Sequence, residues 1–227
     1  MKKYQTTLIG KKRIAKDTIE VSFSLPHDFN FQAGQYIQLG VPQLLYSDAA
    51  GHSRLMSIAS SPLNQKEICI AFRDTGSGFK DTLKSLKVGS PAIIEGPYGF
   101  FTLSDRPSYP FVFIAGGIGV TPYVSMLQYA AATKLNISIT LLYTNSNDES
   151  AAYLKDLQEL SRHDNSIRVK NMFGRVDEHF LVENVSDPYN CVWYISGPPT
   201  MVDYVRNLLF LLGVDDDKIC FEEFTGY

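Results

Sequence analysis

The 227-residue chain has few cysteines, a single tryptophan and little net charge. Its three cysteines, Cys69, Cys191 and Cys220, are scattered through apolar segments, which indicates buried thiols and excludes a four-cysteine iron–sulfur site. The four histidines show none of the paired spacing that metal ligands have. The sequence therefore predicts a protein without a bound metal.

Charge and hydropathy argue against two further classes of protein. The formal net charge is -3 at pH 7, which gives no sign of nucleic-acid binding. No apolar run approaches the roughly 20 residues that cross a bilayer, and the opening stretch MKKYQTTLIGKKRIAKD lacks the apolar centre of a signal peptide. We therefore expect a cytoplasmic protein without a membrane span.

The apolar content is high enough for a substantial core. With 44% hydrophobic residues, the chain can form one large domain or two domains of about 100 residues each. The sequence pattern changes at SDRPSYP, residues 104–110. We therefore expect two domains, 1–105 and 106–227.

The first half has the pattern of antiparallel β structure. TIEVSFSL, residues 18–25, alternates and places its apolar residues on one face: Ile19, Val21, Phe23 and Leu25. A turn-rich link leads into a second strand ending at residue 39, further strands are expected at 54–60, 67–72 and 90–96, and one short helix is expected at 81–87. Many short strands with glycine-rich turns are typical of a barrel or a sandwich.

The second half alternates between strands and helices. The expected strands are 111–115, 137–143, 167–173, 191–196 and 218–224, and the expected helices begin at Thr121, run around 151–160 and cover 200–213. This alternation predicts a parallel sheet covered by helices. In the last helix, Thr200 and Asp203 have the spacing of a capping box.

Three glycines follow the first strand of this half. Gly116, Gly117 and Gly119 allow a tight turn and leave the peptide groups open to a ligand. Thr121 is expected to cap the next helix, with Pro122 in its first turn. An anion or a dinucleotide could bind the free N–H groups there, but a tight connection that binds nothing explains the glycines alone equally well.

Seven motifs occur in one order along both halves, and together they resemble the ferredoxin–NADP reductase family. They are FQAGQYIQL (31–39), RLMSIASSP (54–62), SGFKDTLKSLKVG (77–89), EGPYGFFTL (95–103), GGIGVTP (116–122), SGPPTM (196–201) and FEEFTGY (221–227). The resemblance implies an N-terminal antiparallel Greek-key β-barrel that binds FAD non-covalently. It also implies a C-terminal α/β domain with a parallel sheet that binds NAD(P), and an active site between the two domains.

The resemblance also implies roles for individual residues. Arg54 should bind an FAD phosphate and Ser57 should hydrogen-bond flavin N5. From the residues alone, Arg54 could instead form a surface ion pair, and the Ser57 hydroxyl could instead hydrogen-bond the backbone. The other implied FAD contacts are Leu55, Met56, Ile70, Phe72, Gly76, Gly78, Phe79 and Lys80. The implied nucleotide contacts are Gly116, Gly117, Gly119, Val120, Thr121, Pro122, Gly197, Pro198, Pro199 and Met201. The implied catalytic residues are Ser57, Ser196, Glu222 and Tyr227, and Tyr227 should also cover the flavin ring.

Two positions depart from the family pattern. Met56 stands where the family has a tyrosine that packs on the flavin, and its thioether can lie against a ring but cannot stack on it or donate a phenol hydrogen bond. Ser196 stands where many members have a cysteine, and it keeps a small hydrogen-bonding group there. We expect altered flavin affinity or potential.

The implied activity is that of an FAD-dependent NAD(P)H reductase, which passes hydride from NADH or NADPH to FAD and then single electrons to a separate ferredoxin or oxygenase component. The two departures leave open a second interpretation, an FAD-binding electron-transfer or regulatory subunit of a larger complex without its own NAD(P)H activity. An α/β nucleotide-binding domain of another class, such as a transferase, is a third. A monomer is compatible with the sequence, which does not determine the oligomeric state.

The choice between the two nicotinamide cofactors is weakly marked. The run NSNDE, residues 145–149, contains no cation, and its acidic residues would repel a 2′-phosphate. This favours NADH. Arg175 could still approach the adenosine half, so NADPH stays open.

Overall fold

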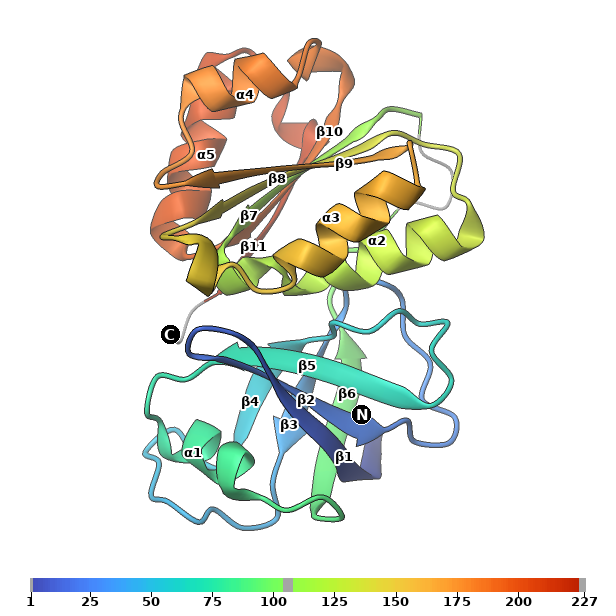
Figure 1. Ribbon diagram of the computed structural model, residues 1–227, viewed down its shortest axis with the longest axis vertical. Coiled ribbons are helices and arrows are strands. Elements are labelled where there is room, and N and C mark those ends of the chain that lie inside the picture. The colour runs from blue at the N-terminus through green and yellow to red at the C-terminus, as the bar shows by residue number, and fades with distance from the viewer. Residues whose placement is uncertain (1, 104–107, 225–227) are drawn as a thin grey trace.

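The computed structural model describes residues 2–103 and 108–224. Figure 1 shows two units stacked along the long axis, an antiparallel barrel below and a sheet with helices above, here called the barrel and the α/β unit. The predicted domain boundary at residues 105 and 106 and the predicted site residue Tyr227 lie outside the described residues.

The barrel is built from six antiparallel strands. They are β1 (Lys3–Ala15), β2 (Thr18–Ser24), β3 (Tyr36–Gly40), β4 (Ser53–Ser57), β5 (Glu67–Arg73) and β6 (Pro91–Tyr98), with helix α1 (Gly78–Ser85) between the last two. The strand order is β4-β3-β6-β1-β2-β5, and an antiparallel bridge between Ile58 and Ile70 joins the two ends of this order. The antiparallel barrel implied by the resemblance is confirmed.

Alternation of apolar residues explains the barrel core. Val21 and Phe23 are completely buried, and Ile19 and Leu25 pack against the same cluster, so the predicted inward face of β2 is confirmed. The 13-residue strand β1 was not predicted. Its lysines, threonines and glycine obscure the pattern, because just two of its residues, Thr6 and Leu8, are buried.

The α/β unit is a parallel sheet with helices on both faces. Its strands are β7 (Phe111–Gly116), β8 (Ile139–Asn145), β9 (Ile167–Phe173), β10 (Val192–Gly197) and β11 (Ile219–Glu223), in the order β11-β10-β7-β8-β9. Its helices are α2 (Thr121–Thr133), α3 (Leu154–His163), α4 (Glu178–Asn184) and α5 (Pro199–Leu211). Short 3-10 turns are η1 (Gly117–Val120), η2 (Asp148–Ser150), η3 (Pro188–Asn190) and η4 (Asp216–Lys218). The predicted parallel sheet is confirmed, whereas α4 was not predicted.

Successive residues of β7 serve the two faces of the sheet. Phe113 stacks on Tyr123 of α2 with 4.7 Å between the ring centroids, in a core that includes residues of α3. Ile114 faces the other way and joins a core with residues of α4 and α5. Two-sided coverage explains why β7 is a continuous apolar run.

Two helix caps differ from the prediction. Thr121 is the first residue of α2, and its hydroxyl donates to the Ile118 carbonyl at 2.6 Å instead of capping the helix, because the turn η1 already precedes α2. Helix α5 begins at Pro199 without a side-chain cap, so the capping box of Thr200 and Asp203 was wrong. Among the helices of the described residues, none has the length and apolar character that a membrane crossing requires.

The two units pack directly against each other. Ala33, Ala59 and Phe101 of the barrel belong to the same buried cluster as residues of α2. The Ser125 hydroxyl of α2 donates to the Ser60 carbonyl at 2.7 Å, across this interface. The end of β11 and the turn after β7 lie beside the barrel, at the carboxyl edge of the sheet, where ligands of open α/β sheets usually bind.

Candidate functional site

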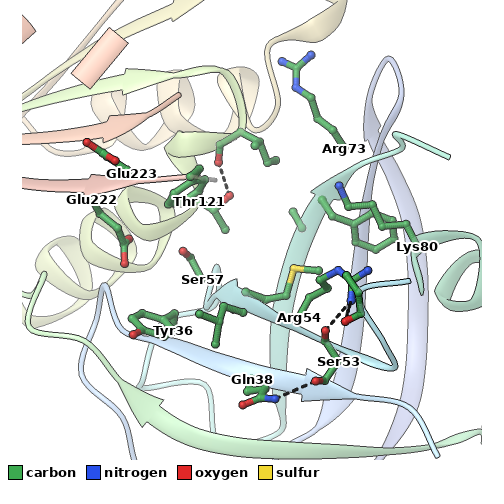
Figure 2. Close-up of a pocket in the computed structure, with 17 residues that line it drawn as sticks. Tyr36, Gln38, Ser53, Arg54, Ser57, Arg73, Lys80, Thr121, Glu222 and Glu223 are labelled. Carbon is green, nitrogen blue, oxygen red and sulfur yellow. Dashed lines mark hydrogen bonds between the residues drawn. The ribbon is translucent and has the colours of Figure 1, made fainter. Parts of the chain in front are cut away.

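A cleft of about 700 Å³ lies between the barrel and the carboxyl ends of the parallel strands. One wall comes from β3, β4, β5 and α1, and the other comes from η1, the start of α2 and the end of β11 (Figure 2). The cleft brings together eight predicted site residues: Arg54, Leu55, Met56, Ser57, Phe72, Lys80, Thr121 and Glu222. Its volume is in the usual range for cofactor sites.

Arg54 is fixed at the barrel end of the cleft. Its Nη2 lies 2.6 Å from Asp48 Oδ1, and its Nη1 donates to the carbonyls of Ala50, Gly51 and Ser53. The guanidinium carbon lies 5.1 Å from the centroid of the Phe79 ring. These contacts hold the cation between the loop before β4 and helix α1.

Asp48 links Arg54 to the start of α1, a contact that no local sequence pattern predicts. Its Oδ2 accepts the Phe79 backbone N–H at 2.8 Å, and this hydrogen bond is the main reason why the pKa of Asp48 lies below its ordinary value. The loop approaches α1 so closely that a β-carbon on Gly78 would lie 2.2 Å from the Ser47 carbonyl oxygen. Gly78 is therefore required for packing at this point.

A second cation lies at the same end of α1. Lys80 is 6% exposed, and its Nζ donates to Thr75 Oγ1 at 3.0 Å. Burial lowers the pKa of Lys80, and the nearby positive charge of Arg54 lowers it further. Two cations beside the amino end of a helix suit an anion such as a pyrophosphate.

Strand β4 presents alternate side chains to opposite sides. Met56 is 9% exposed and belongs to the barrel core while also lining the cleft, and Leu55 is 64% exposed. Ser57 pairs in register with Tyr36, which lines the cleft and lies 5.7 Å from the Tyr98 ring, centroid to centroid. Tyr36 belongs to the motif FQAGQYIQL, residues 31–39, but its place in the cleft was not predicted.

The glycine turn packs tightly against its neighbours. A β-carbon on Gly119 would lie 2.4 Å from the Ser196 carbonyl oxygen. Gly117 has a φ of +55°, and a β-carbon there would lie 3.0 Å from Nη2 of Arg73. Arg73, at the end of β5, thus reaches from the barrel to the turn, which sequence reasoning missed because the contact joins distant segments (Figure 2).

Glu222, which lines the cleft, and Ser196, its partner in register on β10, each have an oxygen without a hydrogen-bond partner in the described part of the chain. Ser196 Oγ and Glu222 Oε2 are buried and have no hydrogen-bond partner among the described residues. Burial raises the pKa of Glu222 to about 7. Figure 2 shows Glu222 and Ser57 pointing into the space between the two walls. Buried polar atoms normally have partners, so a bound ligand with polar groups fits this site.

The remaining predicted residues lie around the cleft and do not line it. Ile70 and Phe79 are completely buried in the barrel core, and Gly76 lies in an open turn. The others lie in or next to the two turns after β7 and β10: Gly116, Gly117, Gly119, Val120, Pro122, Ser196, Gly197, Pro198, Pro199 and Met201. Their individual roles stay predictions. Within residues 2–103 and 108–224, no group of three His, Cys, Asp or Glu side chains could hold a metal ion.

Comparison with known proteins gives the same two-part division. A model described as the oxidoreductase FAD-binding domain matches residues 5–103, and one described as the oxidoreductase NAD-binding domain matches residues 113–207. Between them the two models match most of the chain.

Three relatives illustrate the range of similar proteins. The flavohemoprotein of Bacillus subtilis (strain 168) is 26% identical, over 98% of this chain and 60% of its own length. The reductase component of propane 2-monooxygenase from Mycolicibacterium smegmatis is 27% identical, over 88% of this chain and 61% of its own length. The crystal structure of ferredoxin-NADP+ reductase from Plasmodium falciparum has the same fold, with a TM-score of 0.79, 21% identity, and 98% and 96% of the two chains covered.

The chain thus spans about three fifths of the length of the two relatives matched by sequence. The FAD-binding match covers the barrel, and the NAD-binding match covers most of the parallel sheet. The cleft is lined by residues of both units. This chain therefore contains an oxidoreductase FAD-binding domain followed by an oxidoreductase NAD-binding domain, and it has the fold of ferredoxin–NADP+ reductase.

Proposed function

We propose that this chain is a flavoprotein reductase that takes hydride from NADH or NADPH and passes single electrons to a separate carrier protein, such as a ferredoxin or an oxygenase component. When bound, FAD would supply the chemistry that accepts two electrons from the nicotinamide and releases them one at a time. The protein aligns the two cofactors and excludes water from the space between them. In this proposal residues 1–105 hold FAD and residues 106–227 hold the nicotinamide nucleotide.

One observation carries the proposal. The cleft joins a cationic barrel wall, with Arg54 and Lys80, to a sheet edge where Ser196 and Glu222 hold two buried oxygens without partners. Glu222 lines the cleft, and a cleft that bound nothing would leave its buried oxygen unpaired, which destabilises the fold. A polar group of a bound ligand would satisfy it.

The barrel residues are assigned to FAD. Arg54, Lys80 and the backbone N–H groups at the start of α1 would hold its pyrophosphate, and Asp48 would keep Arg54 oriented toward it. Ser57 would hydrogen-bond the reacting edge of the flavin, and Met56 would lie against the ring as an apolar support.

The other wall is assigned to the nicotinamide nucleotide. The glycine turn lets the dinucleotide approach the backbone, and Arg73 adds a cation next to Gly117, suited to its pyrophosphate. Ser196 and Glu222 would lie where the nicotinamide meets the flavin. The acidic residues Asp148 and Glu149 at the end of β8 favour NADH over NADPH.

Anaerobic reduction of the purified protein tests the proposal. The reductase is expected to be yellow, with flavin absorbance that bleaches when NADH or NADPH is added. Yellow protein that neither cofactor bleaches would support an electron-transfer or regulatory subunit instead. Protein that takes up no flavin under any condition would refute both interpretations and leave an α/β nucleotide-binding domain of another class.

A further inference from the structure

A buried acid in the barrel meets a tyrosine of the α/β unit. The Tyr153 hydroxyl donates to Glu20 Oε2 at 2.6 Å. Lys12, opposite Glu20 in the β1–β2 pairing, places its Nζ 2.9 Å from the other carboxylate oxygen. Glu20 is 6% exposed and Tyr153 is 7% exposed, so their hydrogen bond is shielded from water.

The same hairpin makes a second contact with the same segment. The Lys16 backbone N–H, at the tip between β1 and β2, donates to the Glu149 carbonyl at 2.7 Å. The Lys16 ammonium also pairs with the Glu149 carboxylate at 3.3 Å. In Figure 1 the tip of this hairpin lies directly beneath the yellow-orange segment between β8 and α3. The β1–β2 hairpin of the barrel therefore contacts residues 149–153 at both ends, through Glu149 and through Tyr153.

Stability alone gives a poor account of this contact. A buried carboxylate is usually matched or exceeded in stability by an apolar pair of similar volume. Tyr153 also has a φ of 60°, and a bulky residue in the left-handed region is strained. Two unfavourable features coincide where the units meet, so a gain in stability does not by itself explain the contact.

Residues 149–153 lie close to the expected nucleotide site, so their placement can affect hydride transfer. Residues 149–153 follow β8, the neighbour of β7 in the sheet, at the edge where nucleotides bind in open α/β sheets. Hydride transfer depends steeply on the distance and alignment of the reacting atoms. A hydrogen bond that fixes this segment on the barrel fixes the nucleotide wall relative to the flavin wall.

We propose that Glu20 and Tyr153 are positioning residues whose hydrogen bond sets how the nucleotide-binding unit sits on the barrel during hydride transfer. This inference rests on the proposed function. Neither residue lines the cleft, so both act through the placement of other groups. Glu20 and Tyr153 are together called the clasp.

Three variants isolate the clasp. Tyr153→Phe removes the hydroxyl and keeps the ring, and Glu20→Gln keeps an acceptor for that hydroxyl. Tyr98→Phe is the matched control, because the Tyr98 hydroxyl also donates to a glutamate, Glu95 Oε1 at 2.9 Å, but does so within the barrel. For the FAD-loaded proteins we would measure the rate constant of flavin reduction at saturating NADH and NADPH. For the same proteins with and without FAD we would measure amide hydrogen exchange over residues 15–20 and 149–157.

Tyr153→Phe is expected to lower the reduction rate constant roughly tenfold and to speed exchange in both segments, with FAD content unchanged. Glu20→Gln should stay close to the wild type, and Tyr98→Phe should leave the rate constant and the exchange of both segments unchanged. A wild-type rate constant in Tyr153→Phe, or unchanged exchange over residues 15–20, would overturn the proposal. If neither nicotinamide reduces the wild-type flavin, the proposed function fails, and exchange in the FAD-free protein still decides whether the clasp couples the units.

Discussion

Ser196 and Glu222 are direct neighbours in the register between β10 and β11, and each holds a buried oxygen without a hydrogen-bond partner among the described residues. Adjacent parallel strands thus end in a pair of desolvated polar groups, of which Glu222 lines the cleft and Ser196 lies beside it. Such an arrangement is unfavourable for the empty fold and favourable for a ligand that supplies the missing partners.

Replacing Ser196 with alanine separates these two effects. Because the Ser196 hydroxyl makes no hydrogen bond in the described structure, Ser196→Ala should leave the free energy of unfolding of the FAD-free protein unchanged or slightly higher. Flavin reduction by NADH should slow roughly tenfold if the hydroxyl contacts the nicotinamide. Urea unfolding and stopped-flow absorbance measure the two quantities.

Ser125 provides the control for that experiment. Its buried hydroxyl donates to the Ser60 carbonyl at 2.7 Å, so Ser125→Ala should lower the free energy of unfolding by about 1 kcal/mol. An equal loss of stability in Ser196→Ala would show that the Ser196 hydroxyl has a structural partner and would count against its assignment to the ligand.

The titration of Glu222 predicts how stability changes with pH. Burial raises its pKa from 4.5 to about 7, so between these values the folded protein keeps a proton that the unfolded chain has lost. The resulting stabilisation is complete below pH 4.5 and is lost as pH rises through 7. Glu222→Gln should remove a decrease of about 2 kcal/mol in the free energy of unfolding between roughly pH 5 and 8, measured by urea unfolding.

Glu223 is the matched control, since it lines the same cleft next in sequence and is exposed. Glu223→Gln should leave the pH dependence of the wild type in place. A wild-type slope in Glu222→Gln would mean that Glu222 is charged at neutral pH and that its environment is more polar than the described structure indicates.

Local sequence patterns predicted most of the fold, and the exceptions have identifiable causes. Strands β7 and β8 were predictable because coverage on both faces makes β7 a continuous apolar run and β8 a mostly apolar one. Strand β1 was missed because basic and polar residues occupy most of its exposed positions. The caps of the helices at Thr121 and Pro199 were misjudged because a preceding turn and the Pro198 backbone take the place of a side-chain cap.

The candidate site was less predictable, because its contacts join distant segments. Motifs identified Arg54, Lys80 and Glu222, each of which lines the cleft. Nothing local marks Arg73 as the neighbour of Gly117, a contact that exists because β5 ends beside the glycine turn. The run 145–149 contains no cation in sequence, yet the fold brings Lys16 of the barrel to Glu149.

Arg54 and Ser57 should affect different steps. Arg54→Ala removes a cation of the proposed pyrophosphate site and the partner of Asp48, so it should weaken FAD retention at least tenfold. Ser57→Ala should retain FAD and chiefly slow its reduction. Arg168→Ala is a control for the loss of an arginine that donates side-chain hydrogen bonds, because Arg168 donates to Thr140 on β8 and does not line the cleft. Flavin fluorescence after gel filtration measures retention, and the reverse ranking of Arg54 and Ser57 would contradict the assignment.

Coenzyme preference should respond to charge at the end of β8. Asp148 and Glu149 repel a 2′-phosphate. A nearby cation, Lys16, is already paired with Glu149. The wild type should therefore be reduced more efficiently by NADH than by NADPH. Asp148→Arg should raise the efficiency with NADPH roughly tenfold relative to NADH, measured as the ratio of rate constant to dissociation constant in stopped-flow reduction. Glu178→Arg makes the same change of charge on exposed α4 and should leave the ratio unchanged. An equal response to both substitutions would show that net charge, and not a local 2′-subsite, sets the preference.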